Sequence, residues 1–387
     1  MVLLTPKNQM ENSAHMLKYI TTGESHGHYM AAILEGLPSG LPIDLDYING
    51  ELRRRQGGYG RGARQKIETD GVEIMGGVIK KVTTGAPLGF LLTNKDFKIE
   101  EMPELFRPRP GHADLAGALK YDQGIRAVLE RSSARETSMR VAVGAACKLF
   151  LKAFGIEIAA HVVQIGNAVL PARDITVEEI RRESKDSPVR CVCKKTEKAM
   201  VQRIAAATKH GDSLGGKYEV RATGLPIGLG SYVHFERKLD ARLAMILMSQ
   251  QSAKAVEIGE GVELAGALGS EAHDEIFYGK ARGYFHKTNR AGGFEGGMTN
   301  GADLVVRLTM KPISTLARPL ASVNMKTKKV EKADFERSDV CAVPAGSVIG
   351  EALVAYVLAD AFLEKFGGDS IREIRRNYEG YLKHARA

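Results

Sequence analysis

Apolar residues recur along the chain in short runs, some of which have the alternation of a β-strand. In residues 303–310 (DLVVRLTM), Leu304, Val306, Leu308 and Met310 fall on one face and Arg307 and Thr309 on the other. This period of two residues predicts a half-buried strand. Residues 72–82 and 88–94 are further strand-like runs, with glycine turns between them.

Other segments have the composition and end signals of helices. Thr176 and Glu179 stand in the spacing of a capping box and predict a helix start. A second helix is predicted from a cap at Thr196 to a stop at Gly211. Residues 351–368 are apolar and end on glycine, as a buried helix does.

The best-defined helical pattern covers residues 131–155 (RSSARETSMRVAVGAACKLFLKAFG). Ser133 and Glu136 have capping-box spacing, and Gly155 closes the segment. The apolar residues that recur on one face are Met139, Val143, Ala146 and Phe150.

The amino end of that helix is a candidate anion site. Its free N–H groups and partial positive charge would lie beside the hydroxyls of Ser132 and Ser133, with Arg131 and Arg135 flanking them. Taken alone, the same residues fit equally well an ordinary capped helix with surface arginines.

Strands separated by glycine-rich turns, with long helices between them, predict an α+β layered protein. Because no repeat and no Ser/Pro-rich linker divides the chain, residues 16–387 are expected to form a single domain. Residues 1–15 are expected to be a disordered extension, since Met16 opens the first strand-like run. No signal peptide is recognised and no apolar run approaches the roughly 18–20 residues that span a bilayer, so we expect a cytoplasmic protein without a membrane partner.

The net charge of the chain favours one class of ligand but does not identify a particular ligand. The chain of 387 residues has 55 Lys and Arg against 46 Asp and Glu, a formal charge of +9, which favours anionic ligands. Its four cysteines form no CxxC pair, so we expect four thiols and no metal site.

The densest cationic stretch is residues 53–65, RRRQGGYGRGARQ, with five arginines, four glycines and no acidic residue. Its GGYGRG core resembles an arginine–glycine box of RNA-binding proteins. Those boxes come as repeats in disordered tails, whereas this is a single copy with few aromatic neighbours, so nucleic acid is not the expected partner.

The sequence does not support a P-loop, a Rossmann glycine motif or a nucleophile elbow. Gly211, Gly216 and Lys217 have P-loop spacing, but Tyr218 replaces the hydroxyl residue and the segment runs from a predicted helix into a strand. No G-x-G-x-x-G follows a strand. Residues 23–27, GESHG, spell a nucleophile elbow, but no uninterrupted helix and no nearby acid partner follow.

Several segments share one style, in which glycine stands beside His, Arg, Ser or Asp. They are TTGESHG (21–27), RRRQGGYGRGAR (53–64), FRPRPGHAD (106–114), ERSSARET (130–137), HKTNRAGGFEGGMTNG (286–301), MKPISTL (310–316) and ERSDVCAVPA (336–345). As an ordered set they resemble the chorismate synthase family from about Leu17 to the C-terminal helix.

That resemblance implies a reaction and a fold. The reaction is the 1,4-anti elimination of phosphate and the carbon-6 proton from 5-enolpyruvylshikimate 3-phosphate, which gives chorismate for aromatic amino acid biosynthesis. Reduced FMN is the implied cofactor and is not consumed overall. The implied fold is a β-α-β sandwich of antiparallel sheets covered by helices, assembled as a homotetramer.

The resemblance also assigns residues. It places the flavin on Arg131, Ser132, Ser133, Gln251, Ser252, Gly296, Lys311, Pro312, Ile313, Ser314, Thr315 and Arg337. It places substrate phosphate and carboxylates on Arg55, Arg61, Arg64, Arg109 and Arg135, whose guanidinium groups clamp oxyanions and stay charged. The implied catalytic residues are His26 toward the phosphate, His112 toward the flavin, Asp339 as a proton relay and Ser25 in support.

Two questions stay open at the level of sequence. The enzyme either reduces its own flavin with NADPH or another nicotinamide cofactor, or depends on a separate flavin reductase, and the lack of an added reductase domain favours the second. A flavin oxidoreductase with net hydride transfer is the alternative reaction class.

Overall fold

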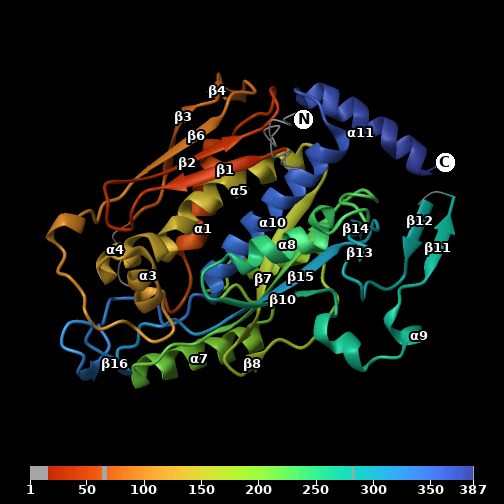
Figure 1. Cartoon of the computed structure of the whole chain (residues 1–387). Helices are drawn as coiled ribbons and strands as arrows, with labels where there is room; N and C mark the ends of the chain where they lie inside the picture. The colour runs from red at the N-terminus through yellow and green to blue at the C-terminus, as the bar shows by residue number, and fades with distance from the viewer. Residues whose placement is uncertain (1–15, 63–67, 281–282, 387) are drawn as a thin grey trace, which may run out of the picture.

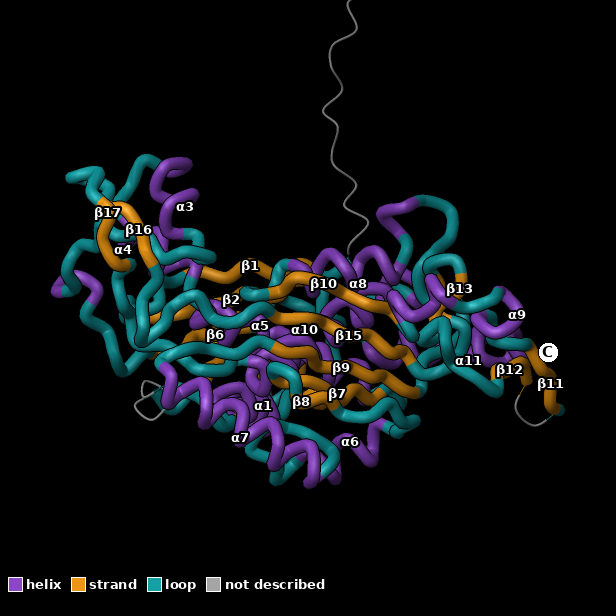
Figure 2. The backbone as a smooth tube through the Cα atoms, turned by 90° about the horizontal axis from the view of Figure 1, so that it is seen from below, coloured by secondary structure: helices purple, strands orange, loops and turns teal. Residues whose placement is uncertain are grey.

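Figure 1 shows the computed structural model of the chain, which describes residues 16–62, 68–280 and 283–386. The predicted extension at residues 1–15 lies outside the described residues. Two antiparallel sheets lie on either side of a layer of helices (Figure 1), and Figure 2 shows the strands of the second sheet side by side. This arrangement confirms the α+β class and the β-α-β sandwich.

The first sheet comes from the N-terminal part of the chain. Its strands, in spatial order, are β1 (Lys18–Thr22), β2 (Tyr29–Glu35), β6 (Leu88–Thr93) and β3 (Val72–Gly76). Every neighbouring pair is antiparallel. The inner residues Met30, Phe90 and Leu92 are buried.

The second sheet has the order β10 (Ala253–Ile258), β15 (Leu304–Met310), β9 (Gly216–Thr223), β7 (Glu157–Ile165) and β8 (Ala168–Val169). Strand β15 buries Leu304, Val306, Leu308 and Met310 and leaves Arg307 and Thr309 partly exposed, which confirms the predicted alternation.

Four two-stranded ribbons complete the β structure among the described residues. They are β4 (Val78–Ile79) with β5 (Val82–Thr83), β11 (Ile276–Gly279) with β12 (Gly283–His286), β13 (Phe294–Glu295) with β14 (Met298–Thr299), and β16 (Ala321–Val323) with β17 (Val330–Lys332).

The layer between the sheets is built from α5 (Thr137–Lys152) and α10 (Val343–Phe366), flanked by α1 (Leu45–Gln56) and α8 (Leu239–Met248). Helix α5 packs under β2 and helix α10 packs on β7 and β9. Helices α6 (Val177–Ser184) and α7 (Lys194–His210) pack against β7 at the opposite side of the second sheet. The remaining α-helices of the described residues are α3 (Asp114–Tyr121), α4 (Ile125–Ser132), α9 (Gly269–Ala272) and α11 (Ile371–Arg386). The short 3-10 helices are Ile99–Glu101, Ala134–Glu136, Phe235–Arg237 and Gly261–Gly266.

Helices α5 and α10 approach each other through small residues. A Cβ atom on Gly144 of α5 would lie 2.4 Å from the Cβ of Ala352 on α10. Helix α10 also lies close to strand β9, because a Cβ atom on Gly350 would lie 2.3 Å from the hydroxyl of Tyr218. Helix α10 is long and apolar enough to cross a membrane, but 94% of its most apolar window is buried inside the protein. It is therefore a core helix.

Several predicted element boundaries are wrong. Residues 72–82 do not form one run, because Gly77 (φ 87°) and the left-handed residues Lys80 and Lys81 divide it into β3, β4 and β5. Helix α7 starts at Lys194 with Cys193 at its cap, so Thr196 lies inside the first turn.

The C-terminal and capping predictions have mixed outcomes. Helix α10 begins at Val343, earlier than predicted, because Pro344 is well suited to a first helical turn. It ends at Phe366 before Gly367, as the glycine signal predicts. The capping box of Thr176 and Glu179 is confirmed at α6.

The segment 131–155 is not one capped helix. Ser132 ends α4, Ser133 caps the 3-10 helix by accepting from the backbone N–H of Arg135, and α5 starts only at Thr137. The Glu136 side chain binds Thr21 and Arg140 and so makes no reciprocal cap. The predicted capping box at Ser133 is therefore wrong, although the four predicted apolar positions of α5 are all buried.

Candidate functional site

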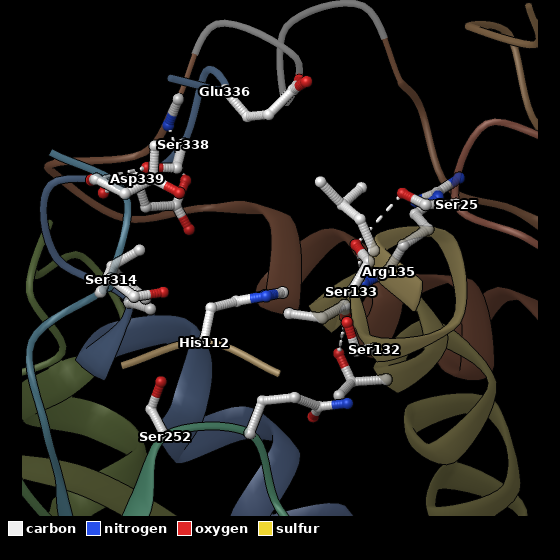
Figure 3. Close-up of a pocket in the computed structure, with 18 of the residues that line it drawn as sticks. Ser25, His112, Ser132, Ser133, Arg135, Ser252, Ser314, Glu336, Ser338 and Asp339 are labelled. Atoms are coloured by element: carbon white, nitrogen blue, oxygen red, sulfur yellow. Dashed lines mark hydrogen bonds between the residues drawn. The ribbon is translucent and has the colours of Figure 1, made fainter. Parts of the chain in front are cut away.

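A cavity of about 450 Å³ opens where the loops of the first sheet meet the N-terminal end of α10. Residues far apart in sequence line it (Figure 3), and they come from segments 25–26, 55–62, 96–102, 109–113, 129–137, 250–252, 310–315 and 336–349. In this view Ser25, Ser133 and Arg135 lie on one side and Ser338 and Asp339 on the other, with His112 between them.

Charge is distributed unevenly around this cavity. Among the described residues that line it, seven are Arg or Lys and four are Asp or Glu. The lining therefore carries an excess of three positive charges before either histidine is counted, which suits a ligand with several anionic groups.

Two arginines from distant segments share one carboxylate at the cavity wall. Arg55, at the end of α1, donates from NH1 to Asp70 at 3.1 Å, and Arg135 donates from NH1 to the other Asp70 oxygen at 2.5 Å. Asn94 accepts two further bonds from Arg135 through its Oδ1, at 2.7 and 3.0 Å.

Burial lowers the pKa of Arg55 to about 10, even though Asp70 opposes the shift, and the nearby guanidinium groups of Arg135 and Arg61 lower it further. The charged form of this arginine is thus only partly compensated inside the protein. A bound anion would supply the missing compensation.

The glycine-rich loop at residues 57–62 is fastened to the segment that carries Asp339. Arg61 forms an ion pair with Asp339, and the backbone N–H of Gly62 donates to the same carboxylate at 2.7 Å. Gly60 (φ 89°) accepts from the N–H of Val340 at 2.8 Å, in a left-handed conformation that favours glycine. Arg64 lies outside the described residues.

His26 is held by a buried carboxylate on α4. Its ring Nδ1 lies 2.9 Å from Oε1 of Glu130, and its backbone N–H donates to Oε2 at 2.7 Å. Next to it, the hydroxyl of Ser133 donates to Ser25 at 3.1 Å. Hydrogen bonds from His26 lower the pKa of Glu130 although burial alone would raise it, so this carboxylate is ionised at neutral pH.

His112 contacts the carboxylate of Asp114, whose two oxygens also accept hydrogen bonds from Arg109. Its Nδ1 lies 2.5 Å from Asp114 Oδ1 and 3.0 Å from NH2 of Arg109. Arg109 binds both Asp114 oxygens, at 2.8 and 2.9 Å, and donates to Thr315 at 2.9 Å. Despite burial, bonds from Arg109 and His112 hold the pKa of Asp114 well below its usual range.

The cavity contains polar atoms that need a partner. The side-chain oxygens of Ser132 and Gln251 are buried and have no hydrogen-bond partner among the described residues. Beside them, Ser252 has a left-handed backbone (φ 70°) and its carbonyl accepts from the N–H of Lys311 at 2.9 Å. Since buried polar atoms are normally satisfied, these oxygens fit the edge of a polar ligand such as a flavin ring.

Most residues that the sequence assigned to one site do meet at this cavity. Those that line it are Ser25, His26, Arg55, Arg61, Arg109, His112, Ser132, Ser133, Arg135, Gln251, Ser252, Lys311, Ile313, Ser314, Thr315, Arg337 and Asp339. Their individual roles stay predictions.

Three assigned residues lie elsewhere among the described residues. Arg131 points away and donates to the backbone oxygens of Thr21 and Gly23. Gly296 lies in the turn between β13 and β14, and Pro312 sits between lining residues without lining the cavity.

Sequence reasoning missed the groups that hold the site together. Glu130 and Asp114 both lie in quoted motifs, ERSSARET and RPGHAD, so their spacing from the histidines and arginines could have indicated them. Asp70 and Asn94 lie outside every quoted motif, and no local signal marks them.

The rejected motifs fail structurally for the reasons given from the sequence. Gly211 ends helix α7 and Gly216 opens strand β9, the reverse of the P-loop order. The GESHG segment connects β1 to β2, so a strand rather than a helix follows Ser25. All four cysteines are free thiols.

Comparison with known proteins gives one consistent result. The family model described as chorismate synthase matches residues 17–363. A chorismate synthase of Geobacter sulfurreducens is 50% identical over 96% of this chain and its own full length, and one of Alkaliphilus oremlandii is 49% identical with the same coverage. A solved structure described as a crystal structure of chorismate synthase superposes with a TM-score of 0.81 at 40% identity, covering 96% of this chain and 98% of that one.

Proposed function

The chain belongs to the chorismate synthase family, and from that premise we propose that it converts 5-enolpyruvylshikimate 3-phosphate into chorismate and phosphate with reduced FMN bound. Enzymes of this family are lyases that serve aromatic amino acid biosynthesis. The proposed reaction is a 1,4-anti elimination, and no net oxidation or reduction takes place.

The observation that carries this proposal is the excess of cationic groups around the cavity, together with two histidines that are each held by a carboxylate. The proposed substrate carries two carboxylates and a phosphate, and FMN adds another phosphate. Arg55, Arg61, Arg109 and Arg135 would clamp these oxyanions, with Arg64 as a further contributor.

The residues present fit a flavin. The unpartnered oxygens of Ser132 and Gln251 would take hydrogen bonds from its ring system, beside Ser133, Ser252, Arg337 and the segment Lys311–Thr315. Arg131 and Gly296 lie away from this cavity, and they enter the proposal only through the family resemblance. When bound, reduced FMN supplies electron density that eases departure of the phosphate.

The protein's own groups would handle the protons. The carbon–oxygen bond to phosphate would break with its electron pair on the leaving oxygen. The carbon-6 C–H bond would give its electron pair to the second ring double bond and its proton to the relay that ends at Asp339. His26 would deliver a proton from Nε2 to the departing phosphate, because Nδ1 is held by Glu130. His112 would balance charge at the flavin, and Asp339 with Ser25 would relay a proton.

The proposal extends to assembly and supply. We infer a homotetramer in the cytoplasm, with residues 16–387 as one catalytic domain. A separate flavin reductase would supply reduced FMN, and direct reduction by NADPH is the alternative.

Anaerobic incubation with the enolpyruvyl substrate and chemically reduced FMN tests the function. Chorismate absorbance and free phosphate should rise together while the reduced flavin is not used up. A flavin oxidoreductase would instead consume one equivalent of reductant for each product.

Substitutions test the two histidines. His26→Ala and His112→Ala should each leave a folded protein whose turnover falls by roughly two to four orders of magnitude. Near-normal turnover in either variant would remove that histidine from the mechanism.

A further inference from the structure

Glu130 contacts Ser25 and His26, in the connection between β1 and β2, at three points. It does not itself line the described part of the cavity. Its carboxylate binds both the ring and the backbone N–H of His26, and its carbonyl oxygen accepts from the N–H of Ser25 at 3.1 Å. The side chain of Glu130 is only 1% exposed. One residue of α4 thus fixes both the position and the ring orientation of His26.

The carboxylate of Glu130 is directed mainly at this histidine. Arg126 also lies near it, but its NH1 is 4.0 Å from Oε1, and its hydrogen bonds go to the carbonyl of Pro103 and to Glu336. At the other histidine, Arg109 binds both oxygens of Asp114 and neutralises much of its charge. His26 therefore faces a less compensated negative charge than His112 does.

This geometry has a direct chemical consequence. A carboxylate on Nδ1 keeps a proton on that nitrogen, which makes Nε2 the ring atom that exchanges a proton with a ligand. An aspartate holds the histidine of a catalytic triad in one tautomer and orientation in the same way.

We propose that Glu130 is a positioning residue that acts through His26, fixing its tautomer and the orientation of its ring for proton delivery to the departing phosphate. The delivery itself rests on the proposed function. In that step the Nε2–H bond of His26 breaks, the proton bonds to the phosphate oxygen, and His26 is left neutral.

The test uses the full chain without flavin or substrate, so its first readout does not depend on activity. Diethyl pyrocarbonate attacks the unprotonated imidazole, and mass spectrometry of peptides measures the modification rate of His26 alone. At pH 8, Glu130→Gln should raise that rate at least about threefold, because the ring is no longer held at Nδ1 in one orientation by the carboxylate.

A matched control separates this effect from a general loss of buried charge. Glu136 is also a buried carboxylate, on the neighbouring 3-10 helix, but it binds Arg140 and Thr21 instead of a histidine. Glu136→Gln should leave the His26 rate unchanged. The other charged groups that neighbour this part of the cavity are Glu24, Glu68, Asp96, Lys98, Arg126 and Arg135, and all variants keep them.

Kinetics supply the second readout. Glu130→Gln should lower kcat by about 10–100-fold with KM within about threefold, the usual cost of removing a partner that orients a functional histidine. Glu130→Asp, which keeps the charge on a shorter side chain, should recover part of kcat. If Glu130→Gln does not fold, Glu130→Asp takes its place in the labelling test and should still react faster than wild type.

The experiments distinguish failure of the Glu130 proposal from failure of the proposed function. Wild-type labelling in the Glu130 variant, or an equal loss of kcat in Glu136→Gln, overturns the role of Glu130 and leaves the proposed function standing. If the wild-type protein releases no phosphate from the enolpyruvyl substrate while labelling depends on Glu130, the proposed function fails and the control of His26 by Glu130 survives.

Discussion

Arg54 and Arg55 are neighbours in sequence, yet each belongs to a different group of charges. Arg54 joins the buried cluster, which we define as Glu51, Arg54, Lys148 and Glu351. Arg55 joins the cavity cluster, defined as Arg55, Glu68, Asp70 and Arg135.

The two clusters differ in how their charges are matched. In the buried cluster each carboxylate contacts both cations directly, and this raises the pKa of Lys148 and lowers those of Glu51 and Glu351. In the cavity cluster both guanidinium groups contact Asp70, whereas Glu68 contacts Arg135 alone at 3.5 Å. Burial lowers the pKa of Arg55, and the nearby Arg135 and Arg61 add to the shift. The buried cluster joins helices α1, α5 and α10, whereas Arg55 and Arg135 line a cavity that can take an anionic ligand.

The largest expected effect follows from breaking the buried cluster. Glu351→Gln should lower the free energy of unfolding by about 3–5 kcal/mol, because Lys148 and Arg54 would each lose a buried partner. Unfolding in guanidinium chloride measures this change. Glu183→Gln, which breaks a surface pair with Arg182, is the control and should cost less than about 1 kcal/mol. A loss that small in Glu351→Gln would contradict a structural role.

A matched pair of substitutions separates the clusters next. Arg55→Lys should lower kcat/KM by about 30–150-fold, the effect of losing 2–3 kcal/mol of charge-assisted hydrogen bonding to the ligand. Arg54→Lys should leave kcat/KM within about threefold and lower thermal stability instead. Equal losses of kcat/KM in both variants would mean that the two arginines are not functionally distinct.

The pH dependence of unfolding sharpens the comparison. The pKa values of Glu51 and Glu351 lie below the ordinary 4.5, since Lys148 and Arg54 favour the charged forms, and Arg190 adds to this at Glu351. Their stabilisation is therefore fully present above about pH 4.5 and is lost as the pH falls below it. Between pH 5 and pH 3, Glu351→Gln should lose roughly 1–2 kcal/mol less stability than wild type. Parallel pH curves would exclude this cluster as a source of acid sensitivity.

The smallest effect is expected at the third arginine of the run. Arg53 is exposed, so Arg53→Ala should change the free energy of unfolding by no more than about 0.5 kcal/mol and leave turnover unchanged. A loss of turnover in Arg53→Ala would show that the cationic run acts as a unit and would remove the distinction between its members.

A structural feature could be predicted from the sequence where neighbouring residues in the chain determine it. The alternation of β15 and the capping box at Thr176 are set by residues within one element, and both are confirmed. The capping box at Ser133 is wrong because the Glu136 carboxylate binds Arg140, four residues later, and Thr21 of β1. The contact with Thr21 depends on the tertiary fold, and no local pattern contains it.

The same distinction applies to the site. Motif by motif, the resemblance gathered His26, His112 and most of the arginines that the fold brings to one cavity. It gave no sign of Asp70 or Asn94, whose function is to hold Arg135 from loops far away in the chain. Groups that bind ligand can be recognised from motifs, whereas groups that support them become visible only through tertiary contacts.

Helix α10 also sets the order in which the molecule is completed during translation. Helices α1, α5 and α8 leave the ribosome before residues 343–366, so the nascent chain lacks one of the two main helices of its central layer until synthesis is almost finished. Until then the apolar faces that α10 will cover are open to chaperones or to other nascent chains. Since Ala345, Gly346 and Ile349 of this helix also line the cavity, a chain released early would lack part of its core and one wall of its binding site.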